Sequence, residues 1–345
     1  MGPRELNDIK RILQDHLRPG IVVVIGSGLS CAEGLPSMRD LADHLAAVDL
    51  AEARVPIDAA TWSEFIKNIK AKGLEGGLKQ MILADEVVDF IRRETAVCVR
   101  VAEDAVVREV FMTRRRLRFS ALLPHLPQDD RFVVITTNYD RLIELAAETA
   151  GFQVDTKSLC SYFARFSRTE GAFAFVQNVL RLNNCLRKVE RRVISLYKPH
   201  GSLDWVDYYG QPIRLGFDVG PERSLIVTPG RDKYRACYDE PFDMHRELAN
   251  DAIDRADRLL IIGYGFNDDH LETHLKTRIR SGRQTVMLAR TLTENAKANL
   301  AVGSSVWGIE ETFGGTNIYN NGKIHEVMGE HLWDVEEFVS GVFGG

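Results

Sequence analysis

The residues Ile21–Ile25 are five consecutive β-branched side chains, and they constrain the fold more than any other stretch of the chain. β-Branched residues favour extended backbone, and an unbroken apolar run of this length is typical of a strand buried on both faces of a sheet. The segment Gly26-Ser27-Gly28-Leu29-Ser30 follows at once, and a helix is expected at residues 38–47. Glycines in such a turn let backbone N–H groups approach a phosphate, but a tight strand-to-helix turn without a ligand explains them equally well.

A second buried strand is predicted at residues 132–135, and polar residues follow it directly. Asn138 and Asp140 stand between this strand and a helix-forming stretch at residues 142–149. Open α/β sheets bind ligands at the carboxyl ends of their strands. Taken alone, either side chain is explained as a helix cap, so a ligand-binding role depends on the residues at the ends of the other strands.

Four predicted strands share this property, because small or polar residues follow each of them. The four segments are Gly26–Ser30, Thr136–Asp140, His200–Ser202 and Gly263–Asp268. The strands before the last two segments are expected at residues 194–197 and 258–262, and further strands at residues 225–227 and 284–289. In a doubly wound sheet the four segments lie on one edge. We therefore predict an α/β fold with a Rossmann-like, doubly wound and mostly parallel sheet, and a nucleotide or dinucleotide site at that edge.

Two regions are expected to be helical insertions into this sheet, at about residues 51–130 and 151–192. Apolar side chains recur at helical spacing in the first, and Gly73, Gly76 and Gly77 predict a break between helices. The basic run around Arg115 is interpreted as a solvated helix face rather than a nucleic-acid patch. The prediction divides the chain into a domain at residues 1–302 and a tail at 303–345, with a hairpin turn at Asn321-Gly322 and a final helix around 332–342.

The composition is that of a soluble globular protein. Hydrophobic residues make up 45%, charged residues 27%, and the net charge of −5 provides no field that favours nucleic acid or an anionic membrane. No apolar run approaches the roughly 18 residues of a membrane helix, and the N-terminus lacks a signal-peptide core. The five cysteines are widely spaced and form no Cys-x-x-Cys, which argues against a disulfide framework and a structural zinc site. We expect a cytoplasmic protein.

One motif competes with the nucleotide interpretation. His270 and His274 are four residues apart, so both lie on one helix face at a spacing that zinc sites use. The pattern is not His-Glu-x-x-His and no third ligand is evident, so structural or surface histidines are favoured. We therefore expect no metal.

The four segments together resemble motifs of the sirtuin superfamily. Residues 26–36 resemble its Gly-Ala-Gly-x-Ser-x-x-x-Gly-Ile-Pro loop with Ser27 for Ala, Thr137-Asn138-Tyr139-Asp140 resembles its Gln-Asn-Ile-Asp motif, and His200-Gly201 matches its catalytic His-Gly. Gly263-Tyr264-Gly265-Phe266 with Asn267-Asp268-Asp269-His270, and Thr228-Pro229-Gly230, resemble the sirtuin-like branch found in bacterial anti-phage defence proteins. The resemblance covers about residues 20–290.

The chain departs from the sirtuin deacylases in two ways. It lacks the small zinc module, whose two Cys-x-x-Cys pairs help form the acyl-peptide groove, and Met38 stands where deacylases usually have Phe before Arg39. That Phe covers the nicotinamide site, so its loss fits a pocket more open to water. The resemblance therefore implies the defence branch, which hydrolyses NAD.

The same resemblance suggests the roles of individual residues, with NAD as substrate. Asn138 is expected to orient the ribose and the attacking water, and Asp140 to accept from the nicotinamide carboxamide. His200 is expected to act as general base, because an imidazole titrates near working pH. The remaining predicted NAD-binding residues are Gly26, Ser27, Gly28 and Ser30 for the diphosphate and adjacent ribose, and Gly263, Phe266 and Asn267 for the adenosine side.

The expected activity is an NAD glycohydrolase that releases nicotinamide and ADP-ribose. Because such an activity is toxic, we expect gating by self-assembly or by a partner. Short family members are often encoded beside a HerA-like hexameric ATPase, and a homo-oligomer is implied by the same resemblance. Two alternatives remain open: an NAD-dependent protein deacylase, which a peptide-acetyl-lysine assay would identify, and a non-catalytic nucleotide or ADP-ribose scaffold, which would bind without turnover.

Overall fold

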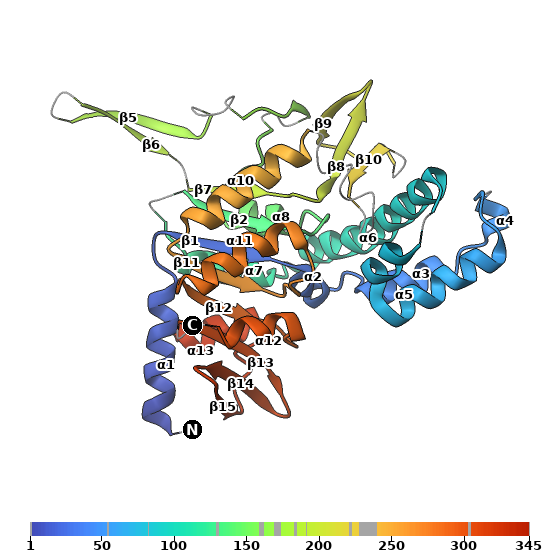
Figure 1. The fold of residues 1–345 in the computed structure, drawn as a ribbon. Coiled ribbons are helices and arrows are strands. Elements are labelled where there is room, and N and C mark those ends of the chain that lie inside the picture. Colours follow the sequence, from blue (N-terminus) through green and yellow to red (C-terminus); the bar gives the residue numbers. More distant parts are fainter. Residues whose placement is uncertain are drawn as a thin grey trace.

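The computed structural model describes residues 2–53, 55–81, 83–128, 131–158, 162–168, 174–182, 185–190, 192–220, 223–227, 240–302 and 305–344. A nine-stranded sheet with the order β15-β14-β13-β12-β11-β1-β2-β7-β3 forms its centre (Figure 1). The strands from β13 to β3 run parallel, and β14 and β15 continue the sheet in antiparallel pairing. The predicted doubly wound, mostly parallel α/β fold is therefore confirmed. The strand bounds are β1 Ile21–Ile25, β2 Phe132–Thr136, β3 Gln153–Asp155, β7 Val193–Tyr197, β11 Arg258–Ile262, β12 Gln284–Leu288, β13 Val306–Thr312, β14 Gly315–Asn320 and β15 Lys323–Met328.

The strand β1 lies in the middle of this sheet and is buried along its whole length. Because successive side chains of a strand point to opposite faces, its residues enter two cores. Val23 and Ile25 pack into one core, while Val22 and Val24 pack into the other. The unbroken β-branched run is thus explained by a strand that is covered by helices on both sides.

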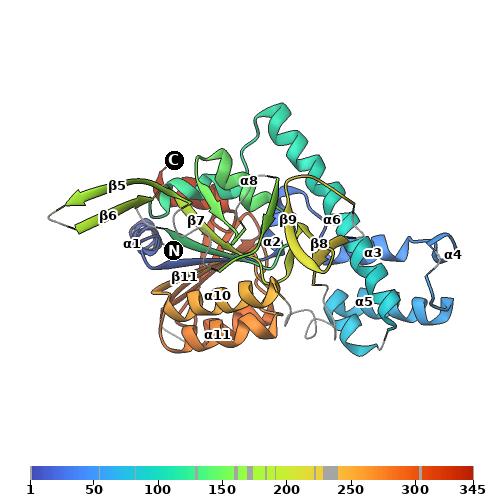
Figure 2. The same ribbon diagram turned by 90° about the horizontal axis from the view of Figure 1, so that it is seen from above.

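The helices cover the two faces of the sheet in separate groups. In Figure 2 the helices α10 and α11 lie on one side of the sheet, and α8 lies on the other. The first core packs under α1 (Pro3–His16), α2 (Ser27–Glu33), α7 (Arg118–Leu122), α8 (Leu142–Thr149) and α13 (Val335–Phe343). The second core packs under α10 (Phe242–Arg255), α11 (Asp269–Arg280) and α12 (Glu294–Leu300).

The first insertion is helical, as predicted, and has a core of its own. It contains α4 (Leu50–Ala53), α5 (Ala59–Gln80), α6 (Asp85–Thr113) and α7, and the preceding helix α3 (Met38–Ala46) packs into the same core. The predicted break at Gly73, Gly76 and Gly77 is wrong, because α5 continues through all three glycines. Each glycine costs a helix roughly 1 kcal/mol, but Ile69 and Leu78 are buried on either side of them, and this packing outweighs the local preference.

The second insertion is not helical, so the prediction for residues 151–192 is wrong. It contains β3, β4 (Phe163–Arg165), β5 (Val176–Leu182) and β6 (Cys185–Glu190). The strand β4 joins a second, antiparallel sheet of order β10-β8-β9-β4, with β8 (Gly201–Tyr208), β9 (Gln211–Leu215) and β10 (Ser224–Ile226), and β5 pairs with β6 in the arm at the upper left of Figure 1. The strands β3 and β4 pair with β7 and β9, which are distant in sequence, and local spacing does not show such partners, whereas β5 and β6 pair with each other.

The last part of the chain completes the central sheet. The strand β13 pairs parallel with β12, and β14 and β15 follow as antiparallel strands. The predicted hairpin turn is confirmed, because Asn321 and Gly322 connect β14 to β15 with φ angles of 49° and 71°. The predicted final helix is also confirmed as α13.

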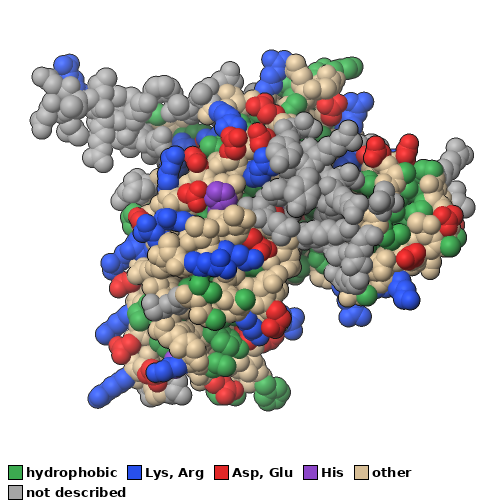
Figure 3. All heavy atoms as spheres, viewed as in Figure 1, with side chains coloured by type: hydrophobic (Ala, Val, Ile, Leu, Met, Phe, Trp, Pro, Cys, Tyr) green, Lys and Arg blue, Asp and Glu red, His purple; other side chains and the backbone are tan. Residues whose placement is uncertain are grey.

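Acidic and basic side chains are interspersed on the face of the molecule shown in Figure 3. Within the described ranges, no helix is both long and apolar enough to cross a membrane.

Candidate functional site

Two cavities open at the carboxyl edge of the parallel strands. The smaller has a volume of about 190 Å³ and is lined by residues from all four predicted segments, among them Ser30, Asn138, Asp140, His200 and Asp268. The larger, of about 640 Å³, lies beside it and reaches the C-terminal segment. Four residues line both cavities, namely Ser27, Tyr264, Gly265 and Asn267. The predicted convergence of the strand ends is therefore observed.

The glycines at this edge bring two backbone segments into contact. A Cβ on Gly28 would lie 2.7 Å from the Cα of Gly263, and one on Gly26 would lie 2.5 Å from the Gly263 carbonyl oxygen. The N–H of Gly26 donates to Ile262 O at 2.9 Å, and that of Gly28 to Gly263 O at 3.0 Å. The prediction that these glycines serve approach to a phosphate needs correction here: both N–H groups are already bonded, and the glycines allow the β1 and β11 loops to touch.

Asn138 is the first member of a hydrogen-bonded chain of buried side chains. Its Nδ2 donates to the carbonyl oxygen of Gly26 at 3.0 Å and to Ser30 Oγ at 2.7 Å. Ser30 Oγ in turn donates to Asp140 Oδ2 at 2.7 Å. Because a carbonyl oxygen only accepts, the orientation of the Asn138 amide is fixed. Both N–H groups of the amide are used within the protein, so its oxygen remains to accept from a ligand or a water.

Asp140 serves the fold and the cavity at once. Its Oδ1 accepts from the N–H of Leu142 at 3.1 Å, a bond across two residues, but the N-cap of α8 is Arg141, so neither Asn138 nor Asp140 is the helix cap that the simpler interpretation expected. It is 3% exposed, and burial raises the pKa of its carboxyl to about 6, against the attraction of the Lys198 ammonium and the hydrogen bond from Ser30. Near neutral pH this carboxyl therefore carries most of a negative charge beside the smaller cavity.

His200 lies at the start of the second sheet and contacts a carboxylate. Its Nε2 is 2.6 Å from Oδ2 of Asp268, and the two side chains are 14% and 6% exposed. The negative charge of a carboxylate oxygen at this distance favours a hydrogen on Nε2, and the basic lone pair of the neutral imidazole is then on Nδ1. Asp268 thus sets the tautomer in which His200 can accept a proton.

Residues 133–301 match the family model of the SIR2-like domain. The match supports the sirtuin superfamily and implies an NAD-binding, sirtuin-type fold for this part of the chain. One similar solved structure concerns the mechanism and regulation of Sir2 enzymes, with 12% identity over 99% of each chain and a TM-score of 0.44. Another concerns sirtuin substrate affinity, with 14% identity over 100% of this chain and 99% of the other, and a TM-score of 0.44. No curated protein matches the sequence.

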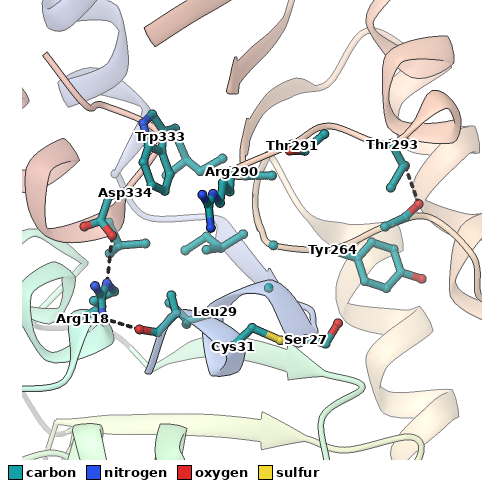
Figure 4. Close-up of a pocket in the computed structure, with 18 of the residues that line it drawn as sticks. Ser27, Leu29, Cys31, Arg118, Tyr264, Arg290, Thr291, Thr293, Trp333 and Asp334 are labelled. Atoms are coloured by element: carbon teal, nitrogen blue, oxygen red, sulfur yellow. Dashed lines mark hydrogen bonds and ion pairs between the residues drawn. The ribbon is translucent and has the colours of Figure 1, made fainter. Parts of the chain in front are cut away.

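The SIR2-like match ends at residue 301, but the larger cavity also uses residues beyond it. Trp333 and Asp334 form one wall, opposite the α2 residues Leu29 and Cys31 (Figure 4). Arg118 Nε donates to Asp334 Oδ2 at 2.8 Å, and an Arg118 N–H donates to the carbonyl oxygen of Ala32 at 2.6 Å. Arg118 therefore ties the C-terminal segment to α2.

The remaining predicted residues differ in their placement. Ser27 and Asn267 are exposed and line both cavities. Phe266 is 1% exposed and packs into the second core, so its side chain does not reach the adenosine side as predicted. Met38 is 40% exposed and lines the smaller cavity. Thr228-Pro229-Gly230 lies outside the described residues.

Sequence reasoning missed three groups at this site: Asp268 as the partner of His200, the buried Lys198, and the wall formed by Trp333 and Asp334. Asp268 was within the quoted segment, but nothing in its spacing indicated a contact with His200. For Lys198, the one available indication was a lysine directly after a buried strand, among the small and polar residues that follow it.

The competing histidine motif does not form a metal cluster in the described part of the chain. His274 Nδ1 lies 2.9 Å from Asp254 Oδ2 at the surface, and the His270 side chain lies outside the described atoms. No group of three or more His, Cys, Asp or Glu residues among the described residues could hold a metal ion. Cys31 and Cys98 are free thiols, and burial raises the pKa of each.

Proposed function

We propose that the chain is an NAD glycohydrolase that cleaves NAD to nicotinamide and ADP-ribose. The SIR2-like match supports NAD as the substrate. One observation carries the choice of hydrolysis: Asn138, Asp140 and the His200–Asp268 pair line a single small cavity beside a larger one.

Cleavage of the nicotinamide–ribose bond needs stabilisation of positive charge. The bond breaks through an oxocarbenium-like transition state, in which charge builds on the ribose as neutral nicotinamide leaves. Asp140 and Asp268 are carboxylates with little exposure on the wall of the smaller cavity, where weak solvent screening strengthens their attraction to such a charge. The reaction needs no group from a metal.

The water that attacks the ribose needs an acceptor and a base. The amide oxygen of Asn138 is the free acceptor in its hydrogen-bonded chain, so it can orient a water or a ribose hydroxyl. His200, with Nε2 directed to Asp268, presents Nδ1 as the base toward the same water or hydroxyl. Together they hold the nucleophile in place while charge develops.

The rest of the dinucleotide fits the larger cavity. Its volume of about 640 Å³ lies within the usual range of ligand pockets, about 300–1,000 Å³. Ser27 and Asn267 line both cavities and can therefore contact the diphosphate that joins the two halves of NAD. Of the predicted phosphate contacts, we retain the two hydroxyls of Ser27 and Ser30, because the N–H groups of Gly26 and Gly28 are bonded elsewhere.

The biological setting is part of the same proposal. The resemblance to the defence branch supports depletion of NAD in the cytoplasm during phage infection. Gating by a homo-oligomer or by a HerA-like hexameric ATPase would keep the toxic activity low before infection. The absence of both Cys-x-x-Cys pairs from the sequence supports hydrolysis over deacylation.

The test is incubation of the purified protein with NAD, alone and with its genomic neighbour, followed by chromatography. We expect ADP-ribose and nicotinamide in equal amounts. His200→Ala and Asn138→Ala should each lower kcat by about 10²–10⁴-fold, the usual contribution of general-base assistance, while NAD binding by calorimetry persists.

Matched controls are His274→Ala, which removes a surface histidine paired with Asp254, and Asn299→Ala, which removes a buried asparagine of α12. Both should retain activity. Full turnover by the His200 variant, or deacylation of an acetyl-lysine peptide without release of free ADP-ribose, would contradict the proposal.

A further inference from the structure

Lys198 is a fully buried lysine that the proposed chemistry does not use. It directly follows β7, two residues before His200, and its side chain is 0% exposed. A buried ammonium is costly unless it is paired and hydrogen-bonded, so its surroundings need an explanation.

The ammonium group has three oxygen partners. Nζ donates to the backbone oxygen of Asp140 at 2.6 Å, to Ser202 Oγ at 3.0 Å and to Glu144 Oε1 at 3.1 Å. An ammonium has three N–H donors, so its capacity is filled. The three partners come from the loop after β2, from β8 and from α8, so one side chain joins three elements.

Two of these elements carry the residues that face the proposed substrate. Asn138 and Asp140 belong to the loop after β2, and His200 immediately precedes β8. The backbone around Lys198 strengthens the junction, because Leu203 N donates to Tyr139 O at 3.0 Å and Ser202 Oγ to the same oxygen at 3.3 Å. The Lys198 ammonium is the charged member of this junction.

Lys198 also affects the charge of Asp140. The groups that shift the pKa of Asp140 from neighbouring elements are Lys198, Ser30 of α2 and Glu103 of α6, and Glu144 and Cys31 lie close by. Among them Lys198 is the cation, and its attraction lowers the pKa of Asp140 against the effect of burial.

We infer that Lys198 is a positioning residue, which holds the Asn138–Asp140 loop and the His200 strand in register and keeps Asp140 charged at neutral pH. The test of this inference by activity rests on the proposed NAD hydrolysis. The test by stability does not.

The first experiment compares Lys198→Met with Lys276→Met, a control that removes a lysine from another Lys–Glu pair, on α11. We expect Lys198→Met to lower kcat by about 10–100-fold with KM for NAD changed less than about threefold, because misplaced groups lose rate more than binding. The acidic limb of the pH–kcat profile should move to higher pH. The control should match the wild type. An equal loss in kcat and in affinity, with an unmoved profile, would overturn the inference.

The second experiment uses stability and needs no turnover. A carboxyl whose folded pKa is raised holds its proton longer in the folded state, so stability falls as pH rises from about 4 to the folded pKa. In the wild type this decline ends near pH 6, the pKa of Asp140. In Lys198→Met it should continue to higher pH than in the wild type, seen as a falling Tm, because the attraction that lowers the pKa of Asp140 is lost.

Two double variants assign that decline. The fall in stability at higher pH should disappear when Lys198→Met is combined with Asp140→Asn. It should remain when Lys198→Met is combined with Glu144→Gln. The opposite result would show that the lysine serves Glu144 and would overturn the inference. If Lys198→Met does not fold, Ser202→Ala gives the same comparison with one bond removed, and kcat should fall about 3–10-fold with KM unchanged. A wild type that is inactive both alone and with its genomic neighbour would refute the proposed function. The stability result would then decide the inference about Lys198.

Discussion

The two cavities at the sheet edge differ in what lines them. The smaller is built from side chains that are buried and joined by short contacts, as in the Asn138–Ser30–Asp140 chain and the His200–Asp268 pair. The larger combines backbone, threonines, the aromatic ring of Trp333 and two arginines, of which Arg118 is held by Asp334 while Arg290 is exposed and paired with Glu311. Side chains are therefore held most rigidly in the smaller cavity, where bond cleavage is proposed. The larger cavity is suited to holding the rest of the ligand.

This division makes separate expectations for the two cavities. Substitutions in the smaller one should change kcat, those in the larger one should change KM, and those in the shared wall should change both. The shared wall should show the largest effects and the larger cavity the smallest.

The turn that carries the shared residues Tyr264 and Gly265 should be the least tolerant part of the site, at Gly263, which itself lines the larger cavity. Gly263→Ala places a Cβ 2.6 Å from Leu29 N at a φ of +59°. Overpacking costs about 1–3 kcal/mol and the left-handed backbone about 1–2, so unfolding should be easier by about 2–5 kcal/mol. Kcat and KM should both worsen. Gly282→Ala is the control, because it has a φ of +84° with nothing within 4 Å of the new Cβ, and should cost about 1 kcal/mol in urea unfolding.

Acid should destabilise the fold through two buried histidines, of which only one lies behind the smaller cavity. Burial lowers the pKa of His245 to about 3 and that of His16 to about 4. The unfolded state then binds more protons between these values and about 6.5, so stability is lost as pH falls below 6.5. Asp140 acts in the opposite direction between about 4 and 6.

The loss between pH 7 and 4.5 should be about 2–3 kcal/mol for each histidine. His16→Gln and His245→Asn should each reduce it in urea titrations at both pH values. Only His245→Asn should also lower kcat, because His245 Nδ1 accepts from the backbone N–H of Lys198 at 3.1 Å. An equal effect of both variants on kcat would remove the distinction between the two regions.

In the smaller cavity, Asp268→Asn should affect chemistry more than binding. The amide keeps the size of the side chain but no longer favours the tautomer with the base on Nδ1. We expect kcat to fall about 10–100-fold with little change in KM. Asp254→Asn, which alters the partner of the surface residue His274, is the control. A rise in KM with unchanged kcat would place Asp268 in binding instead.

In the larger cavity, Trp333→Ala should raise KM for NAD about 3–10-fold and leave kcat unchanged, the loss expected for one aromatic contact. Calorimetry with ADP-ribose should show the same weakening. Trp307→Ala, on β13 and outside both cavities, controls for general loosening of the C-terminal segment. Lowered kcat at saturating NAD would contradict the assignment of this cavity to binding.

The sequence allowed prediction of the parallel strands because their signal is local. Runs such as Ile21–Ile25 and Leu259–Ile262 are buried on both faces and therefore apolar throughout. Residues 151–192 were misinterpreted in part because β3 and β4 depend on pairing with strands distant in sequence. The helix α5 was interrupted in the prediction because the packing around its glycines is tertiary.

The sequence allowed prediction of several residues that form the candidate site, but not of the contacts between them. Asn138, Asp140 and His200 follow strands, and strand ends of one sheet must meet. The direction of each side chain was not available, which explains why Phe266 was assigned to a cavity and lies in the core. Asp268 and Lys198 act on residues 68 and 58 positions away in sequence, and only the fold shows those contacts.

The antiparallel strands at the C-terminus have a practical consequence for expression. The family match stops at residue 301, and a chain shortened to that point would seem a natural minimal domain. Such a chain would leave the hydrogen-bonding edge of β12 bare, and unprotected edges of this kind recruit other molecules. Insoluble protein from such a deletion would then reflect the lost neighbour strand together with the loss of α13 from the first core.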